Sequence, residues 1–185
     1  MAPLEKYIIE QGAPTLASLK TGTLFCVDTT EPGELLRQIG LWNSRLRDKG
    51  VSITLLRYNG HRALVYMYRH SQLRRDLETA GAVELLAQCG YASAEPGYAI
   101  ERLRERFCES AEFPHEIGLF LGYPPEDVRG FIENETRNYK FTGYWKVYGD
   151  EERSRALFDK FERCTRCYLA SWARGTGVER LALAV

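Results

Sequence analysis

The residue pair best suited to chemistry in this chain is His115-Glu116, in a segment from 113 to 127 that holds three prolines and two glycines. Histidine titrates near neutral pH and a carboxylate can accept or orient a proton, so the pair could perform acid–base chemistry. Because Pro114 disfavours a helical conformation for the residue before it, we expect the pair to begin a helix, where backbone N–H groups can bind an anion. The alternative is that one of the two side chains only caps this helix.

Four further side chains could complete a ligand site around that pair. Tyr144 and Lys146 share one face of an expected strand, Lys20 follows a short helical turn, and Arg69 ends a strand. If these segments converge, cations and aromatic rings would surround the histidine and the glutamate. The sequence therefore predicts a pocket for a small polar or anionic ligand, leaves open whether that ligand is transformed, and identifies no cofactor.

The cysteines offer an alternative chemistry. Cys164 and Cys167 have the spacing of redox dithiols and of half a zinc site, and Cys108 and His115 could supply the other two zinc ligands. A redox pair places its first cysteine at a helix N-terminus, whereas Cys164 falls well inside a long expected helix. Its place on the apolar stripe of that helix favours a core cysteine, with metal binding and thiol redox chemistry as alternatives.

Whole-chain composition narrows the class of protein. Over 185 residues, 25 Lys and Arg balance 25 Asp and Glu, so no excess of positive charge favours nucleic acid as a partner. No apolar run approaches the roughly 18 residues of a membrane span, and the first residues do not resemble a signal peptide, so we expect no membrane partner and a cytoplasmic protein. Five scattered cysteines, an odd number, favour reduced thiols. Nothing in the sequence predicts an oligomeric state.

Hydrophobic periodicity predicts the elements that must position these residues. Helices are expected at residues 13–20, 33–49, 71–89 with a break at Gly81, 99–108, from His115, from Pro125, and from Asp150 to Gly175. Strands are expected at residues 23–27, at 51–69 as a hairpin around Asn59-Gly60, at 143–148 and at 178–185. The sum is one α+β domain over residues 1–185, with a mostly antiparallel four- or five-stranded sheet covered by about six helices.

Three blocks of this sequence resemble an uncharacterised bacterial family, a domain of unknown function common in anaerobic Gram-positive bacteria. The blocks are residues 13–20, residues 113–124 with Glu126-Asp127-Val128, and residues 143–148. They include the runs PHEIGLFLGYP and GYWKVY. The resemblance extends over nearly the whole chain and implies no activity, cofactor or partner. A non-catalytic protein-interaction module therefore stands beside the ligand-binding and the metal or thiol hypotheses.

Overall fold

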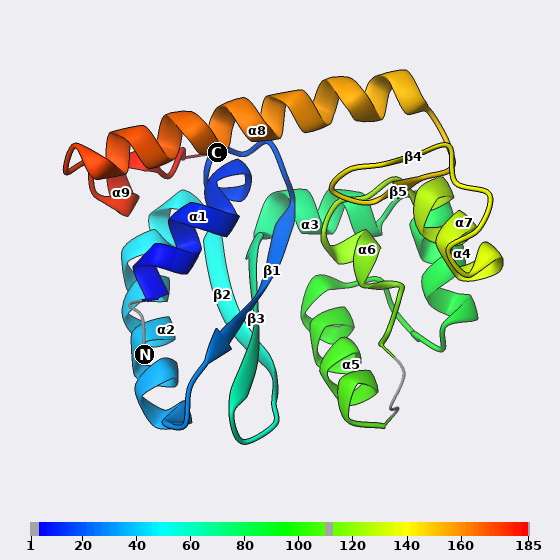
Figure 1. Cartoon of the computed structure of the whole chain (residues 1–185). Helices are drawn as coiled ribbons and strands as arrows, with labels where there is room; N and C mark the ends of the chain where they lie inside the picture. The colour runs from blue at the N-terminus through cyan, green and yellow to red at the C-terminus, as the bar shows by residue number, and fades with distance from the viewer. Residues whose placement is uncertain (1–3, 110–112, 185) are drawn as a thin grey trace. The chain divides into compact units, whose positions relative to one another are not determined.

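The computed structural model describes residues 4–109 and 113–184, and the chain divides into two compact units (Figure 1). Unit 1 comprises the described residues up to Ser71 and from Phe161 onward, and unit 2 comprises residues 72–160. Helices α3 (His70–Leu77) and α8 (Glu151–Ala173) each contribute residues to both units. The prediction that the chain folds as one domain stays a prediction.

Unit 1 is built on a three-stranded antiparallel sheet in the order β1-β3-β2. Its strands are β1 (Gly22–Asp28), β2 (Val51–Tyr58) and β3 (Arg62–Arg69). The last two form the hairpin predicted from the sequence, and its turn contains Gly60 with a φ of 95°, a value that favours glycine. The register shifts between Leu55 and Arg57, which marks a bulge in β2.

Helices α1 (Leu4–Leu16) and α2 (Pro32–Leu46) pack against this sheet (Figure 1). Four apolar residues of α2, Leu35, Ile39, Trp42 and Leu46, are buried in the unit 1 core, whereas Leu36, expected on the same stripe, is exposed. The segment η1 (Arg47–Lys49) extends the helix to Gly50, whose φ is 66°. A left-handed glycine is a common helix terminus, so the end of this element is confirmed. Of the helical turn expected at residues 13–20, residues 13–16 form the end of the longer α1 and residues 17–20 lie beyond it.

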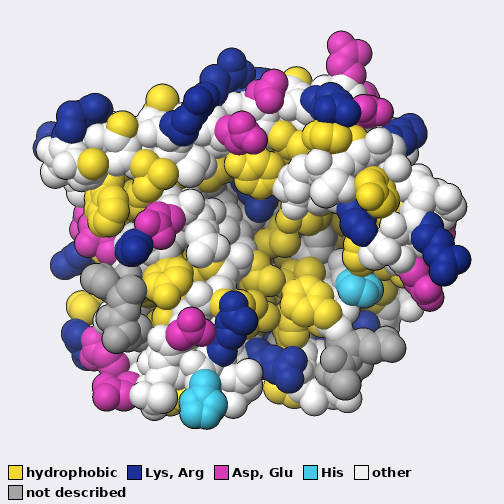
Figure 2. Space-filling view, in the orientation of Figure 1, with side chains coloured by type: hydrophobic (Ala, Val, Ile, Leu, Met, Phe, Trp, Pro, Cys, Tyr) yellow, Lys and Arg dark blue, Asp and Glu magenta, His cyan; other side chains and the backbone are white. Residues whose placement is uncertain are grey.

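Unit 2 consists mainly of short helices and a small ribbon. Its helices are α4 (Ala80–Gln88), α5 (Pro96–Glu109), α6 (Ile117–Phe120) and α7 (Pro125–Asn134), with the parts of α3 and α8 named above. Strands β4 (Phe141–Thr142) and β5 (Lys146–Val147) pair antiparallel. Gly130 lets α7 approach this ribbon closely, because a methyl group there would overlap the ring of Tyr148. The long α8 carries charged side chains of both signs on its exposed side (Figure 2).

The α+β class is confirmed, but two finer expectations are wrong. The described residues form a three-stranded and a two-stranded sheet, not one sheet of four or five strands, and nine helices rather than about six. Residues expected as a terminal strand form α9 (Val178–Leu181) instead. Val178 and Ala182, four residues apart, are both buried, so this short segment has helical as well as alternating periodicity, and packing selects the helix. No helix in the described ranges is long and apolar enough to cross a membrane.

Candidate functional site

Glu116 is a buried carboxylate whose partners all lie in unit 2. It is 2% exposed, its Oε1 accepts a hydrogen bond from the Tyr91 hydroxyl at 3.0 Å, and the Nε of Arg106 donates to the same oxygen. Arg106 also donates to the carbonyl of Cys89 at 3.1 Å. Burial, followed by the nearby Glu116 charge, raises the pKa of Tyr91, so the phenol stays a donor at neutral pH. This geometry uses Glu116 to connect α5 and the end of α4 to the start of α6.

His115, the neighbour of Glu116, is exposed and lies against an aromatic ring of α7. The centroids of the His115 and Phe131 rings are 4.8 Å apart in an edge-to-face arrangement. The Nζ of Lys146 lies 5.8 Å from the centroid of the same Phe131 ring and 4.9 Å from that of Tyr139. Two of the predicted site residues, His115 and Lys146, therefore meet at one aromatic side chain.

Tyr148, two residues after Lys146, packs its ring against Gly130, the residue before Phe131. Its hydroxyl oxygen is buried and has no hydrogen-bond partner among the described residues. Burial first, and then the nearby Tyr139 and Asp127, raise the pKa of Tyr148, so its hydroxyl keeps its proton at neutral pH. Within the described ranges, neither the His115 ring nor the Lys146 ammonium has a hydrogen bond or an ion pair. We refer to His115, Phe131, Tyr139, Lys146 and Tyr148 as the Phe131 patch.

Asp127 holds the ribbon that carries part of this patch. The indole Nε1 of Trp145 donates to its Oδ2 at 2.7 Å, and the backbone N–H groups of Tyr148 and Gly149 donate to its Oδ1 at 2.7 Å each. Asp127 is only 2% exposed. Sequence reasoning missed this role, because an aspartate in the first turn of a helix already has a local explanation in the helix dipole. The available signal was that Asp127 and two of its three partners, Trp145 and Tyr148, belong to the blocks that carry the family resemblance.

A hollow of about 250 Å³ lies in unit 2, lined by residues of α3, the α6–α7 turn, the segment before β5 and the start of α8. We call it the unit 2 hollow. Its aromatic wall is formed by Tyr123 and Trp145, whose rings stack with centroids 4.5 Å apart. Burial raises the pKa of Tyr123 to about 12, so this phenol is neutral at physiological pH. The hollow thus unites residues of the PHEIGLFLGYP and GYWKVY runs, although none of its lining residues was predicted as a site residue.

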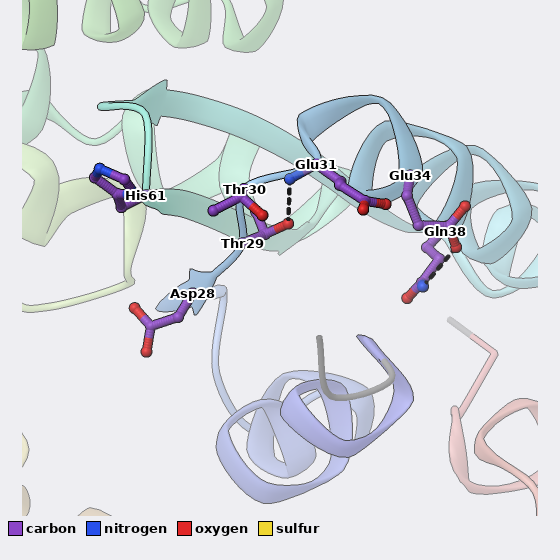
Figure 3. A pocket seen from close by; sticks show the side chains of 7 residues that line it. All are labelled: Asp28, Thr29, Thr30, Glu31, Glu34, Gln38 and His61. Carbon is purple, nitrogen blue, oxygen red and sulfur yellow. Dashed lines mark hydrogen bonds between the residues drawn. The ribbon is translucent and has the colours of Figure 1, made fainter.

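A larger hollow, of about 510 Å³, lies in unit 1 where β1 leads into α2. Figure 3 shows Asp28 and His61 at one end of this unit 1 hollow and Glu34 and Gln38 at the other. Arg37 donates two hydrogen bonds to Glu34, at 2.8 and 2.7 Å, and Gln38 donates a third at 2.9 Å. These bonds, those from Arg37 first, lower the pKa of Glu34 to about 2. Because the side chains spread out and Glu34 is engaged, the hollow has no single point where its polar groups converge.

Two predicted ligand residues, Lys20 and Arg69, belong to unit 1. Arg69 is 1% exposed, and burial lowers its pKa. Its guanidinium donates to four backbone carbonyl oxygens, those of Thr15, Leu16, Lys49 and Leu183. Arg69 therefore binds the end of α1 and the C-terminal segment, which is a structural role. Burial also lowers the pKa of Lys20, to about 8.

The remaining predicted residues have separate surroundings. Tyr144 is exposed and its ring lies 5.4 Å from that of Phe158, centroid to centroid. Cys164 is half-buried, with a pKa raised to about 11 chiefly by burial, whereas a reactive thiol needs a lowered pKa. Cys108 and Cys167 are exposed. In residues 4–109 and 113–184, no group of three or more His, Cys, Asp or Glu side chains could hold a metal ion, so the alternative zinc set that combined these cysteines with His115 has no support.

Comparison with known proteins identifies a family and nothing more specific. No curated protein and no solved structure matches the chain. A family model described as a protein of unknown function, DUF3793, matches residues 8–182. This range contains the two sequence runs, the Phe131 patch and both hollows. The chain belongs to the DUF3793 family.

Proposed function

We propose that this chain binds a small ligand through an anionic group, a carboxylate or a phosphate, at the Phe131 patch of unit 2. The observation that carries the proposal is the buried hydroxyl of Tyr148, which has no partner among the described residues. A buried polar group without a hydrogen bond costs stability, and such groups occur where a ligand completes the bonding. Because Tyr148 keeps its proton, the group that completes it is an acceptor.

The charges around the patch also favour an anion. The Lys146 ammonium lies over two aromatic rings, which stabilise a cation without satisfying its N–H donors. The His115 ring can add a further donor, since imidazole donates from at least one nitrogen in either protonation state. Hydrogen bonds between such donors and an ionised acceptor are about twice as strong as neutral ones.

The neighbouring buried carboxylates do not compete with an incoming anion. Glu116 is bound by Arg106 and Tyr91, and Asp127 accepts three hydrogen bonds from Trp145 and the ribbon backbone. Both acids therefore position the segments that carry His115 and Lys146. In this proposal Glu116 is a positioning residue, and Lys20, Arg69 and Tyr144 take no part.

Calorimetric titration with inorganic phosphate and with acetate, against acetamide as the neutral analogue of acetate, tests the proposal. We expect at least one anion to bind more tightly than acetamide, and Lys146→Met to weaken that binding about tenfold, because a hydrogen bond to a charged group contributes about 1.5–3 kcal/mol. Lys160→Met is the matched control, since Lys160 is an exposed lysine of unit 2 outside the patch. Equal binding by wild type and Lys146→Met, or no preference for either anion, would contradict the proposal.

A further inference from the structure

We infer that the unit 2 hollow is a second binding site, and that its ligand is a small organic cation with ammonium groups. This hollow is distinct from the Phe131 patch. Trp145 lines the hollow, whereas the next residue, Lys146, lies against Phe131 and Tyr139. The inference therefore does not depend on the proposed anion site.

A serine side chain that lines the hollow indicates a binding function. Ser154 is 4% exposed and lines the hollow. Its backbone N–H donates to the carbonyl of Asp150 at 3.2 Å, but its side-chain hydroxyl has no hydrogen-bond partner within the described part of the chain. In the first turn of α8, this hydroxyl is available to a ligand, here as an acceptor for an ammonium N–H.

The charges that line the hollow select a cation. Three acids, Asp76, Glu126 and Asp150, and one arginine, Arg153, line the hollow. Asp76 lies 3.7 Å from Arg75 outside it, and Asp150 accepts the backbone N–H of Arg153. Three negative charges and one positive charge leave a formal charge of −2. Within the described residues Glu126 has no ion pair or side-chain hydrogen bond, so its carboxylate is available to a ligand.

The backbone and the aromatic wall favour the same choice. At the start of α7, Pro124 and Pro125 line the hollow and offer no backbone N–H for an anion. At the start of α8, the Asp150 carboxylate already accepts the N–H of Arg153 at 3.0 Å. Tyr123 and Trp145 present aromatic side chains, which attract ammonium groups through their π electrons. At about 250 Å³, the hollow is smaller than a typical drug-sized pocket of roughly 300–1,000 Å³, so the ligand is small.

Calorimetric titration of the whole chain with putrescine, with butanediol as the neutral match and succinate as the anionic match, tests this inference. We expect putrescine to bind at least tenfold more tightly than butanediol, and succinate to bind more weakly than either. Glu126→Gln and Ser154→Ala should each weaken putrescine binding, by about tenfold and about threefold, because one loses a charged acceptor and the other a neutral one. Glu152→Gln is the matched control, since Glu152 is an exposed acid of α8, the helix of Ser154, and does not line the hollow.

Three outcomes would overturn the inference. They are no putrescine binding by the wild type, butanediol binding as tight as putrescine binding, and putrescine binding that Glu126→Gln leaves unchanged while Glu31→Gln in the unit 1 hollow abolishes it. If a unit 2 variant fails to fold, the relative affinity of the wild type for putrescine, butanediol and succinate still tests the inference. Lys146→Met should leave putrescine affinity unchanged, so the two binding sites can fail separately.

Discussion

The two units bury charge in different ways. In unit 1 the buried guanidinium of Arg69 donates to four backbone carbonyl oxygens. In unit 2 the buried carboxylates of Glu116 and Asp127 are bound by side chains and backbone N–H groups of other elements. In each unit the buried charged side chains connect segments that are distant in sequence. Arg69 and Glu116 were chosen as site residues because their side chains can do chemistry, yet the structure gives both of them a structural role.

The units differ in which polar groups are left without a partner. In unit 2, the hydroxyls of Tyr148 and Ser154, the ammonium of Lys146 and the imidazole of His115 lack hydrogen-bond partners among the described residues. In the unit 1 hollow, Glu34 is already bound by Arg37 and Gln38, and Glu31 and His61 are exposed to solvent. We therefore place both proposed binding sites in unit 2, and assign the buried charges of the two units to stability.

Replacing Arg69 should have the largest effect on stability. Arg69→Met keeps an apolar stem but removes a donor from each of four carbonyl oxygens. Those of Thr15 and Leu16 keep a backbone donor, so the loss falls mainly on the link between α1, Lys49 and the C-terminal segment. We expect the free energy of unfolding to fall by about 3 kcal/mol, measured by urea denaturation. Arg62→Met, at the other end of β3, is the control, because Arg62 is exposed and its nearest carboxylate, on Asp28, lies 3.7 Å away. A loss as small as that of the control would show that unit 1 does not depend on its buried charge.

Neutralising Glu116 should have a smaller effect. Glu116→Gln keeps an oxygen that can accept from Tyr91 but leaves Arg106 without a carboxylate, so we expect a loss of about 2 kcal/mol. Glu105→Gln removes an exposed acid that is paired with Arg102 on α5, and should cost less than about 1 kcal/mol. If Glu116→Gln kept full stability and lost anion binding, Glu116 would act on the ligand directly, as the sequence first suggested, and the comparison between the units would fail.

The sequence predicted the parts of the fold that have local signals. The hairpin around Asn59-Gly60 and the helix that leads to Gly50 are specified by neighbouring residues, through turn chemistry and hydrophobic periodicity. The strand expected at residues 143–148 is reduced to β5, because the N–H groups of Tyr148 and Gly149 bond to Asp127 instead of a partner strand. That bond joins residues more than 20 positions apart, and no local pattern reports it.

In the candidate site, too, the contacts join residues that are distant in sequence, and local patterns do not predict them. His115 and Lys146 were chosen by residue type, and their shared contact with Phe131 could not be derived from spacing. Tyr91 and Arg106, which engage Glu116, lie 25 and 10 positions away from it. The sequence did not identify Ser154 as a site residue, because a serine among charged residues of a helix is usually exposed, and only the structure shows that Ser154 is buried.

The smallest expected change in the free energy of unfolding is a gain in stability, not a loss. Tyr148→Phe removes only the buried hydroxyl that has no partner, so the free energy of unfolding should rise by about 1 kcal/mol, because an unsatisfied buried polar group is destabilising. The same variant should bind phosphate or acetate more weakly than the wild type. Tyr139→Phe is the control, since it removes a hydroxyl from an exposed ring of the same patch. A gain in stability with a loss of anion affinity is expected only if the hydroxyl serves the ligand and not the fold; a loss in both would make Tyr148 a structural residue like Glu116 and Asp127.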